Sequence, residues 1–227
     1  MGQQLDLSSH QNQGIYGRVT ISIDYDYGSG VPGGILRQTA TSYEFQSYGS
    51  YLDSNLLDLP ASVVTSNGAG YKCAQTDFGY DDSSRTFASG VSHHGLSPPG
   101  TVRGNLTAIT RQLGSMPCQS GGTWTPVASY QNVYDTGEVY QTIDPLGHTT
   151  TLTYDTTGTY VVKSQLPDTN SPSYAQHITQ DSYDTNSGLR TSHTDESGNL
   201  TSYSYDEMWR IWTVTYPQGG GTATYSY

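Results

Sequence analysis

A Tyr-Asp pair recurs four times in roughly the last hundred residues of the chain. Successive tyrosines of these pairs are 20, 29 and 22 residues apart. Recurrence of one short motif at such a spacing is typical of repeat proteins, in which each unit buries its surface against its neighbours. The spacing therefore predicts a stack of similar units, built around Tyr134-Asp135, Tyr154-Asp155, Tyr183-Asp184 and Tyr205-Asp206.

Glycines and acidic residues mark turns between these pairs. Three of the pairs are followed by Gly137, Gly158 and Gly188, and two acidic turns lie between pairs, Asp144-Pro145-Leu146-Gly147 and Asp195-Glu196-Ser197-Gly198. Pro145 presets φ for a turn, and Gly147 tolerates the positive φ that such turns require. The Asp of each Tyr-Asp pair can accept hydrogen bonds from backbone N–H groups two residues on. We therefore predict a repeat of strand, acidic glycine turn, strand and Tyr-Asp turn.

The composition supports strands and turns. The chain of 227 residues holds 20 Tyr, 26 Gly and 10 Pro, but only 33% hydrophobic residues. Tyrosine suits a pleated, half-buried surface, and glycine and proline supply turns. Disordered chains are usually poor in aromatic residues, which this chain is not. A tyrosine before each Asp can point inward and stack on the tyrosine of the next hairpin.

Charge and hydropathy exclude several classes of function. The formal net charge is −11, so the chain repels phosphate backbones, and we expect no nucleic-acid ligand. No apolar run approaches the length of a transmembrane helix. The first six residues, Met-Gly-Gln-Gln-Leu-Asp, contain neither a basic region nor an apolar core, so they do not resemble a signal peptide.

The first half of the chain shows the same alternation less regularly. Residues 20–27 alternate with a period of two, which predicts a strand with Ile21, Ile23, Tyr25 and Tyr27 on one face. Further strands are expected at 36–45, within 56–66, at 71–80 and at 103–113, with a hairpin turn at Asn67-Gly68 and a loop over 81–100. We therefore expect degenerate hairpins over 1–123 and regular repeats over 124–227, which can also form one continuous sheet.

No residue pattern points to catalysis. The aspartates of the Tyr-Asp pairs recur with the repeat, whereas the carboxylate pair of a glycosidase should occur once. Asp24, Asp26 and Gly28 lack the later ligands of a calcium loop, and His93-His94 lacks a zinc-protease pattern. We expect no catalytic residue, no metal site and no cofactor. Cys73 and Cys118 either pair or remain free thiols.

The repeating text resembles the Rhs/YD-repeat family, which includes teneurins and the shells of insecticidal toxin complexes. Tyr134 to Asp155 carries the clearest match, and Gly198-Asn199-Leu200-Thr201 resembles a phrase common in such repeats. The motif residues are Tyr134, Asp135, Gly137, Asp144, Pro145, Gly147, Tyr154, Asp155, Gly158, Tyr183, Asp184, Gly188, Gly198, Tyr205 and Asp206. Trp209 stands where the last turn should hold glycine, so we expect that turn to be distorted.

The resemblance implies an all-β fold of antiparallel hairpins that form a curved or spiralling sheet, part of a shell around a toxin or another effector domain. The chain lacks the family's self-cleaving core segment. The expected function is therefore structural and non-catalytic, with the remainder of a longer chain and the enclosed domain as partners, and a secreted or cell-surface location. The alternative is a module that binds carbohydrate or a cell-surface partner through tyrosine-rich sheet faces. We also expect this chain to be a fragment of a longer protein, because its last strand, 222–227, ends abruptly.

Overall fold

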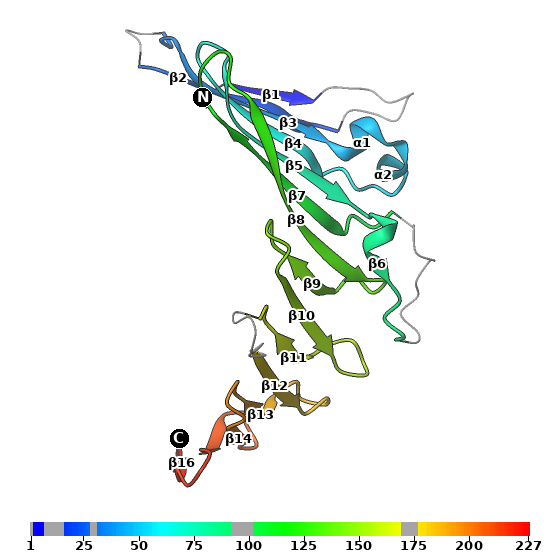
Figure 1. Ribbon diagram of the computed structural model, residues 1–227, viewed down its shortest axis with the longest axis vertical. Coiled ribbons are helices and arrows are strands. Elements are labelled where there is room, and N and C mark those ends of the chain that lie inside the picture. Colours follow the sequence, from blue (N-terminus) through cyan, green and yellow to red (C-terminus); the bar gives the residue numbers. More distant parts are fainter. Residues whose placement is uncertain (1, 7–15, 28–30, 92–101, 169–176) are drawn as a thin grey trace. The chain divides into compact units, whose positions relative to one another are not determined.

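The computed structural model describes residues 2–6, 16–27, 31–91, 102–168 and 177–227, and these residues form two compact units (Figure 1). The first unit comprises the described residues within 1–87 and 97–131, and the second those within 88–96 and 132–227. Strands dominate both units, and neighbouring strands pair antiparallel from β1 to β8, with β5 next to β7, and from β9 to β16. The all-β class and the hairpin arrangement predicted from the sequence are therefore confirmed.

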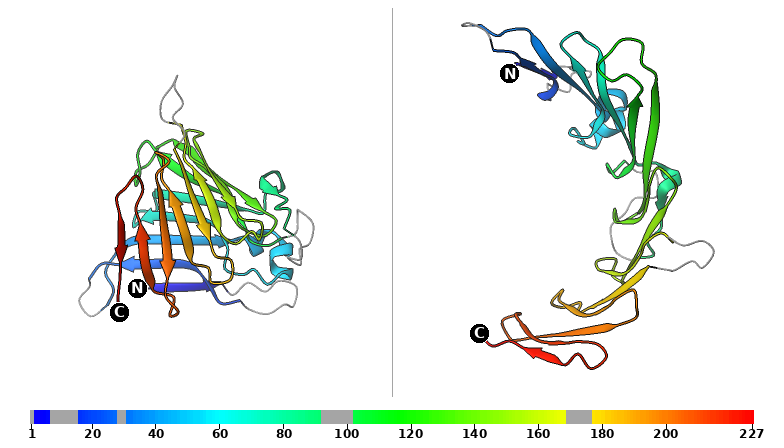
Figure 2. Two further views of the ribbon diagram at one scale, coloured as in Figure 1. Left: turned by 90° about the horizontal axis from the view of Figure 1, so that it is seen from below. Right: turned by 60° about the vertical axis from the view of Figure 1, so that its left-hand side comes forward.

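The first unit is a sheet of long strands, which lie side by side in Figure 2 (left view, blue to green). Its order is β1 (Gly2–Asp6), β2 (Arg18–Tyr25), β3 (Ile35–Tyr43), β4 (Pro60–Asn67), β5 (Lys72–Tyr80), β7 (Leu106–Gly114) and β8 (Trp124–Tyr134). A short strand β6 (Thr86–Phe87), preceded by the 3₁₀ turn η1 (Ser83–Arg85), pairs with β8. The predicted loop over 81–100 thus contains regular structure at its start.

Two short helices provide the core of the first unit. α1 (Glu44–Ser47) and α2 (Gly49–Asp53) follow β3 directly, and Phe45, Tyr51 and Leu52 form a buried cluster. Around it pack the partly buried side chains of Tyr16, Tyr43, Leu56, Leu57, Leu59, Tyr80 and Val102. Burial, with a smaller contribution from the charges of Glu44 and Asp58, raises the pKa of Tyr80 to about 12.

These helices correct the prediction of a strand over 36–45. β3 ends at Tyr43, and Phe45 enters a helix, where its buried ring packs against Tyr16 and Tyr43. A second correction concerns Tyr27, which was placed on the apolar face of the first predicted strand. β2 ends at Tyr25 after a shift in register, and Tyr27 is 102% exposed.

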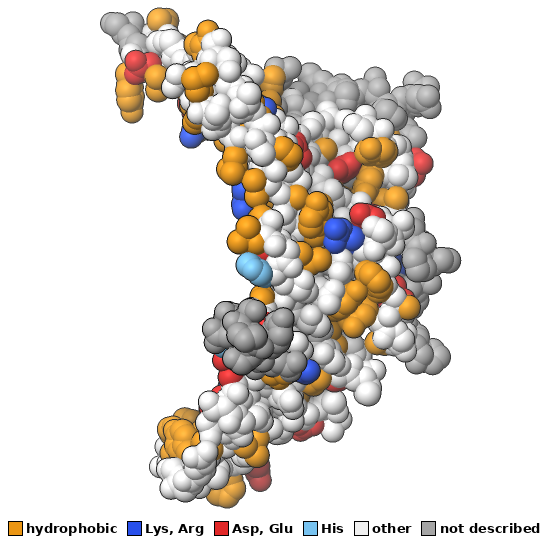
Figure 3. Space-filling model, viewed as in Figure 1, with side chains coloured by type: hydrophobic (Ala, Val, Ile, Leu, Met, Phe, Trp, Pro, Cys, Tyr) orange, Lys and Arg blue, Asp and Glu red, His pale blue; other side chains and the backbone are white. Residues whose placement is uncertain are grey.

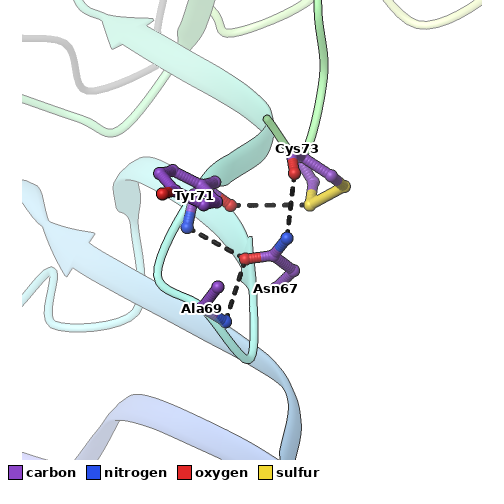
Figure 4. Close-up of a disulfide and its surroundings, with 5 residues drawn as sticks. Asn67, Ala69, Tyr71 and Cys73 are labelled. Carbon is purple, nitrogen blue, oxygen red and sulfur yellow. Dashed lines mark hydrogen bonds between the residues drawn. A yellow bond between two sulfur atoms is a disulfide. The ribbon is translucent and has the colours of Figure 1, made fainter. Parts of the chain in front are cut away.

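A disulfide joins Cys73 at the start of β5 to Cys118 in the loop between β7 and β8. Figure 4 shows Asn67 between this bond and the β4–β5 turn. The Asn67 Nδ2 amide donates to the carbonyl oxygen of Cys118 at 2.9 Å, and Oδ1 accepts from the amides of Ala69 and Tyr71. The sequence left the pairing of the two cysteines open, and the structure shows them bonded.

The second unit is a series of shorter hairpins. It contains the end of β8 from residue 132 onward, followed by β9 (Val139–Ile143), β10 (Thr149–Tyr154), β11 (Val161–Gln165), β12 (Ile178–Tyr183), β13 (Arg190–Thr194), β14 (Leu200–Tyr205), β15 (Ile211–Thr215) and β16 (Thr222–Thr224). Only Val133 and Val214 are buried hydrophobic residues in the described part of this unit. The predicted division into 1–123 and 124–227 concerns repeat type and stays a prediction.

Replacing Phe45 with Ala should lower the free energy of unfolding by about 3–5 kcal/mol, because it removes the centre of the aromatic cluster. Chemical denaturation followed by tyrosine and tryptophan fluorescence measures this loss. Tyr27→Ala is the matched control, and its fully exposed ring predicts a change within about 0.5 kcal/mol. Equal effects of the two substitutions would contradict the assignment of the core.

Candidate functional site: the repeated turns and their tyrosines

Five turns in the described part of the chain share one backbone design. In each, the amide of the first residue donates to the carbonyl of the fifth, and the amide of the fourth donates to the carbonyl of the first. In the turn at 144–148, these N···O distances are 2.9 and 3.0 Å. The other turns with this pattern span 67–71, 134–138, 195–199 and 206–210. The degenerate first half therefore contains the same turn as the regular second half.

In four of these turns, the first side chain completes the hydrogen bonding of the backbone. Oδ1 of Asp144 accepts from the amides of the third and fifth residues, Leu146 and His148, each at 2.8 Å. The same two bonds occur at Asp195 and Asp206. Asn67 makes them with its amide oxygen. A single side-chain oxygen thus satisfies two backbone donors that would otherwise need water.

The fifth residue of the turn binds the second carboxylate oxygen. His148 Nδ1 lies 2.8 Å from Asp144 Oδ2, Asn199 Nδ2 donates to Asp195 Oδ2 at 3.0 Å, and Arg210 Nε donates to Asp206 Oδ2 at 2.8 Å. This side-chain bond is the largest cause that lowers the pKa of each aspartate. This fifth position was not among the predicted motif residues, although a donor residue directly after Gly147 and Gly198 is readable in the sequence.

The fourth residue of the turn has a positive φ. Gly147 and Gly198 have φ values of 89° and 81°, as expected for glycine. Trp209 occupies the same position with φ at 62°, and its turn keeps the same backbone and side-chain bonds. The prediction that this turn is distorted is therefore wrong. The carboxylate of Asp206 holds the backbone in place, and Trp209 adopts the strained positive φ.

The Tyr-Asp pairs close three kinds of turn. Asp206 begins the five-residue turn described above. Asp155 and Asp184 begin longer turns, in which their amides donate to the carbonyls of Tyr160 and Leu189, five residues on. Asp135 is the second residue of the turn that begins at Tyr134. Its carboxylate accepts from the amide of Ser89 at 2.9 Å instead.

The predicted bond to the amide two residues on is present at Asp184 and Asp206, and the backbone amide of Thr157 is among the donors that lower the pKa of Asp155. Asn186 donates to Asp184, and Met208 donates to Asp206, in both cases at 2.9 Å. At Asp155, the carboxylate accepts from the amides of Thr159 and Tyr160. The positive φ expected of glycine occurs at Gly137, Gly158 and Gly188. The assignment of the fifteen residues as one structural repeat motif stays a prediction.

A shift in strand register precedes a tyrosine in six hairpins of the described chain. The shifted tyrosines are Tyr25, Tyr43, Tyr80, Tyr154, Tyr183 and Tyr205. Such a bulge bends the strand and redirects the side chains beside it. Five of these tyrosines, at 25, 80, 154, 183 and 205, precede Asp, so the two Tyr-Asp pairs of the first half share a structural feature with three of the second.

Tyrosine hydroxyls join neighbouring strands. Four tyrosine hydroxyls each donate to the carbonyl oxygen of the first residue of the preceding strand, and the O···O distances are 2.8 to 3.2 Å. The donors are Tyr80, Tyr154, Tyr205 and Tyr227. The acceptors are Pro60, Val139, Arg190 and Ile211. Burial is the largest cause that raises the pKa of Tyr154. The tyrosines thus contribute both apolar surface and a hydrogen bond, as buried tyrosine usually does.

Tyr134, Tyr154 and Tyr183 of the Tyr-Asp pairs pack against other tyrosine rings. Tyr134 packs edge-on against Tyr154, with ring centres 6.2 Å apart, and stacks on Tyr140 at 4.5 Å. Tyr183 stacks on Tyr160 at 4.9 Å. The predicted contact between tyrosines of successive Tyr-Asp pairs therefore occurs at 134 and 154, whereas Tyr183 takes its partner from the turn before β11.

Among the described residues, no group of three or more His, Cys, Asp or Glu side chains could hold a metal ion. Asp24, considered as a calcium ligand, instead binds Arg37 at 2.7 Å. His93-His94 lies outside the described residues. A surface depression of about 550 Å³ is lined by Asp144, His148, Leu166, Pro167, Asp168 and His177, but Asp144 already holds its own turn. Basic side chains are scattered singly on the face shown in Figure 3.

Acid should weaken the fold through the turn aspartates. The folded pKa values of Asp144, Asp195 and Asp206 lie below the ordinary value, so their contribution to stability is present above about pH 4 and is lost as the pH falls through the lowered values. Changing all three to Asn, which keeps the Oδ1 acceptor as Asn67 does, should flatten the dependence of the melting temperature on pH below about 5. Asp53→Asn is the control outside these turns, and an unchanged pH profile in the triple variant would contradict the assignment.

Trp209→Gly should raise the free energy of unfolding by about 1 kcal/mol. The left-handed conformation costs tryptophan about 1–2 kcal/mol, which exceeds the additional chain entropy that glycine loses. Gly147→Ala is the reverse change at the equivalent position, where an added methyl group meets no atom, and should destabilise by about 1 kcal/mol. Urea denaturation measures both changes. A destabilised Trp209→Gly variant would show that the indole ring contributes more than its strain costs.

Tyr154→Phe should cost about 1 kcal/mol, because it removes only the hydrogen bond to Val139. Tyr154→Ala also removes the contact with Tyr134 and should cost about 3 kcal/mol. Equilibrium unfolding of both variants separates the hydroxyl from the ring. A loss below about 0.5 kcal/mol for the alanine variant would mean that the ring has no structural role and is free for binding.

Comparison with known proteins supports the repeat. Residues 183–223 match the model of the RHS Repeat family. No curated protein sequence matches the chain. A solved TcdB2-TccC3 structure without its hypervariable C-terminal region is 15% identical and matches 93% of this chain with a TM-score of 0.51, which shows a shared fold.

Two further solved structures are similar. A TcdB2-TccC3-Cdc42 structure covers 87% of this chain at 15% identity, with a TM-score of 0.47. The Tc holotoxin pore of Photorhabdus luminescens covers 94% at 14% identity, with a TM-score of 0.43. This chain spans only 10% to 14% of the length of these solved chains. The family match runs from the last residue of β12 into β16, and it confirms the resemblance to the Rhs/YD-repeat family.

Proposed function

We propose that the chain is a non-catalytic structural part of an Rhs/YD-repeat shell, which encloses or presents a toxin or another effector domain. One observation carries the proposal: the same five-residue turn, with the same side-chain bonds, closes hairpins at residues 67, 144, 195 and 206. The recurring aspartates are engaged in backbone bonds, as expected of a building element. The RHS repeat at 183–223 supports the same role.

The proposed mechanism is steric. Hairpins whose exposed turns are closed by their own side chains form a wall that excludes proteases and solvent from an enclosed domain. The partners are then the remainder of a longer repeat chain and that domain. Because the chain covers about a tenth of the solved TcdB2-TccC3 chain that it resembles, a wall segment fits its size better than a whole shell.

The disulfide supports a secreted or cell-surface location. Cys73 and Cys118 are bonded, and disulfides persist in oxidising environments outside the cytosol. In the described part of the chain, no helix has both the length and the apolar character needed to cross a membrane.

Carbohydrate or cell-surface binding is the second candidate, and exposed aromatic side chains near the last hairpin favour it. Trp209, Trp212 and Tyr227 are 61%, 54% and 71% exposed. Exposed aromatic rings can stack on sugar rings. A glycan array probed with the wild-type chain and with Trp212→Ala tests this candidate, and loss of specific signals in the variant would support it.

The coding sequence on both sides of this segment tests the shell proposal. We expect further Tyr-Asp repeats and an unrelated effector domain within the same reading frame. In that longer protein, limited proteolysis should leave the effector domain intact, and Tyr154→Ala should expose it to cleavage. A complete reading frame without further repeats, or an effector domain that is cut as readily in the wild type, would overturn the proposal.

A further inference from the structure

Asn67 and Gly68 form the pair of residues that is most prone to spontaneous deamidation. In this reaction the backbone nitrogen of the second residue attacks the side-chain carbonyl carbon of the asparagine. Glycine permits the attack because it has no side chain to obstruct the approach and few conformational restrictions. Asn67 also ends β4 and begins the first five-residue turn, so a change at this side chain affects a hairpin of the first unit.

Three hydrogen bonds hold the Asn67 amide away from Gly68. Oδ1 accepts from the amides of Ala69 at 3.1 Å and Tyr71 at 2.9 Å, and Nδ2 donates to the carbonyl oxygen of Cys118 at 2.9 Å (Figure 4). The side chain must leave all three partners before its carbon can meet the Gly68 nitrogen. Each bond that persists therefore slows the reaction.

The backbone at Gly68 has little room to move. A methyl group placed on its Cα would lie 1.8 Å from the carbonyl oxygen of Ile35, so β3 packs directly against this residue. The peptide cannot turn toward the Asn67 side chain without separating the β4–β5 turn from β3. Packing and hydrogen bonding thus oppose the same movement.

The third hydrogen bond depends on the disulfide. Its acceptor belongs to Cys118, which lies in the loop between β7 and β8 and is bonded to Cys73 in β5. The Cys118 amide also donates to the carbonyl of Lys72 at 2.9 Å. Without the covalent bond, this amide contact is what holds Cys118 against the start of β5, so the loop can withdraw the acceptor from Asn67.

We propose that Asn67 is a deamidation site whose reactivity is controlled by the Cys73–Cys118 disulfide. With the disulfide formed, the amide is held and the site is stable. A dithiol reductant transfers two electrons and two protons to the disulfide, gives two thiols and is itself oxidised to a disulfide. Asn67 then loses its bond to Cys118 and becomes reactive.

The reaction consumes one water and releases one ammonia. The Gly68 nitrogen bonds to the Asn67 side-chain carbon and loses its proton, ammonia leaves, and a succinimide ring forms. Water then opens the ring at either carbonyl to give aspartate or isoaspartate. Neither product can donate a hydrogen bond from Nδ2 to Cys118, because the nitrogen has departed. Since coupling between two equilibria is reciprocal, deamidated protein should also release its disulfide more readily.

Peptide mass spectrometry tests the proposal on the full chain, incubated at neutral pH as the oxidised wild type, the wild type with dithiothreitol, and the double variant Cys73→Ser/Cys118→Ser. We expect deamidation at Asn67 to be about tenfold faster in the last two samples, the effect of losing one hydrogen bond. Asn186-Ser187 in the second unit is the internal reference and should react at one rate in all samples. Equal rates at Asn67 in all three would overturn the proposal.

Phe45→Ala separates local release from general instability, since it weakens the first unit but keeps both cysteines. Slow deamidation at Asn67 in this variant supports control by the disulfide, whereas acceleration equal to that of the cysteine variant overturns it.

Asn67→Asp tests the reciprocal effect, because its carboxylate still accepts from Ala69 and Tyr71 but cannot donate to Cys118. A larger reduced fraction at equilibrium in a buffer of reduced and oxidised dithiothreitol is expected, and an unchanged fraction would contradict the coupling.

Discussion

The fold depends on one side-chain oxygen at the start of four of the five short turns described above. A hairpin turn leaves backbone amides without strand partners, and the first residue of the turn accepts from two of them, as Asp144 does from Leu146 and His148. The second oxygen then binds the side chain of the fifth residue. Because every bond lies within five residues, each turn forms without help from a large core. This locality explains how a chain with 33% hydrophobic residues builds so many hairpins.

Tyrosine provides the contact from one strand to the next. The register shift before Tyr154 or Tyr205 accompanies a hydroxyl bond to the first carbonyl of the preceding strand. Ring pairs such as Tyr160–Tyr183 add apolar contact. Each unit therefore interacts mainly with its neighbours, which is the energetic arrangement of repeat proteins. The first unit adds the helical cluster around Phe45 and a disulfide, and it tolerates less regular repeats.

The sequence predicted what is local and repeated. Alternation and turn residues gave the strands and most turns, and the motif spacing indicated the family. The helices at Glu44–Asp53 were missed because they are too short for a periodic pattern, and their formation depends on burial of Phe45. The turn at Asn67 was predicted as a two-residue hairpin at Asn67-Gly68, but the positive φ is at Gly70. Trp209 was expected to distort its turn, yet local hydrogen bonds outweigh an unfavourable φ.

Hydrogen–deuterium exchange of single amides tests most directly whether side-chain oxygens close the turns. Six loop amides bind aspartate oxygens, and all but that of Asn199 are exposed. They belong to Leu146, His148, Ser197, Asn199, Met208 and Arg210. They should exchange at least about tenfold more slowly than the same amides after substitution of the corresponding aspartate by alanine. Exchange at the rate of an unstructured peptide in the wild-type chain would contradict the account.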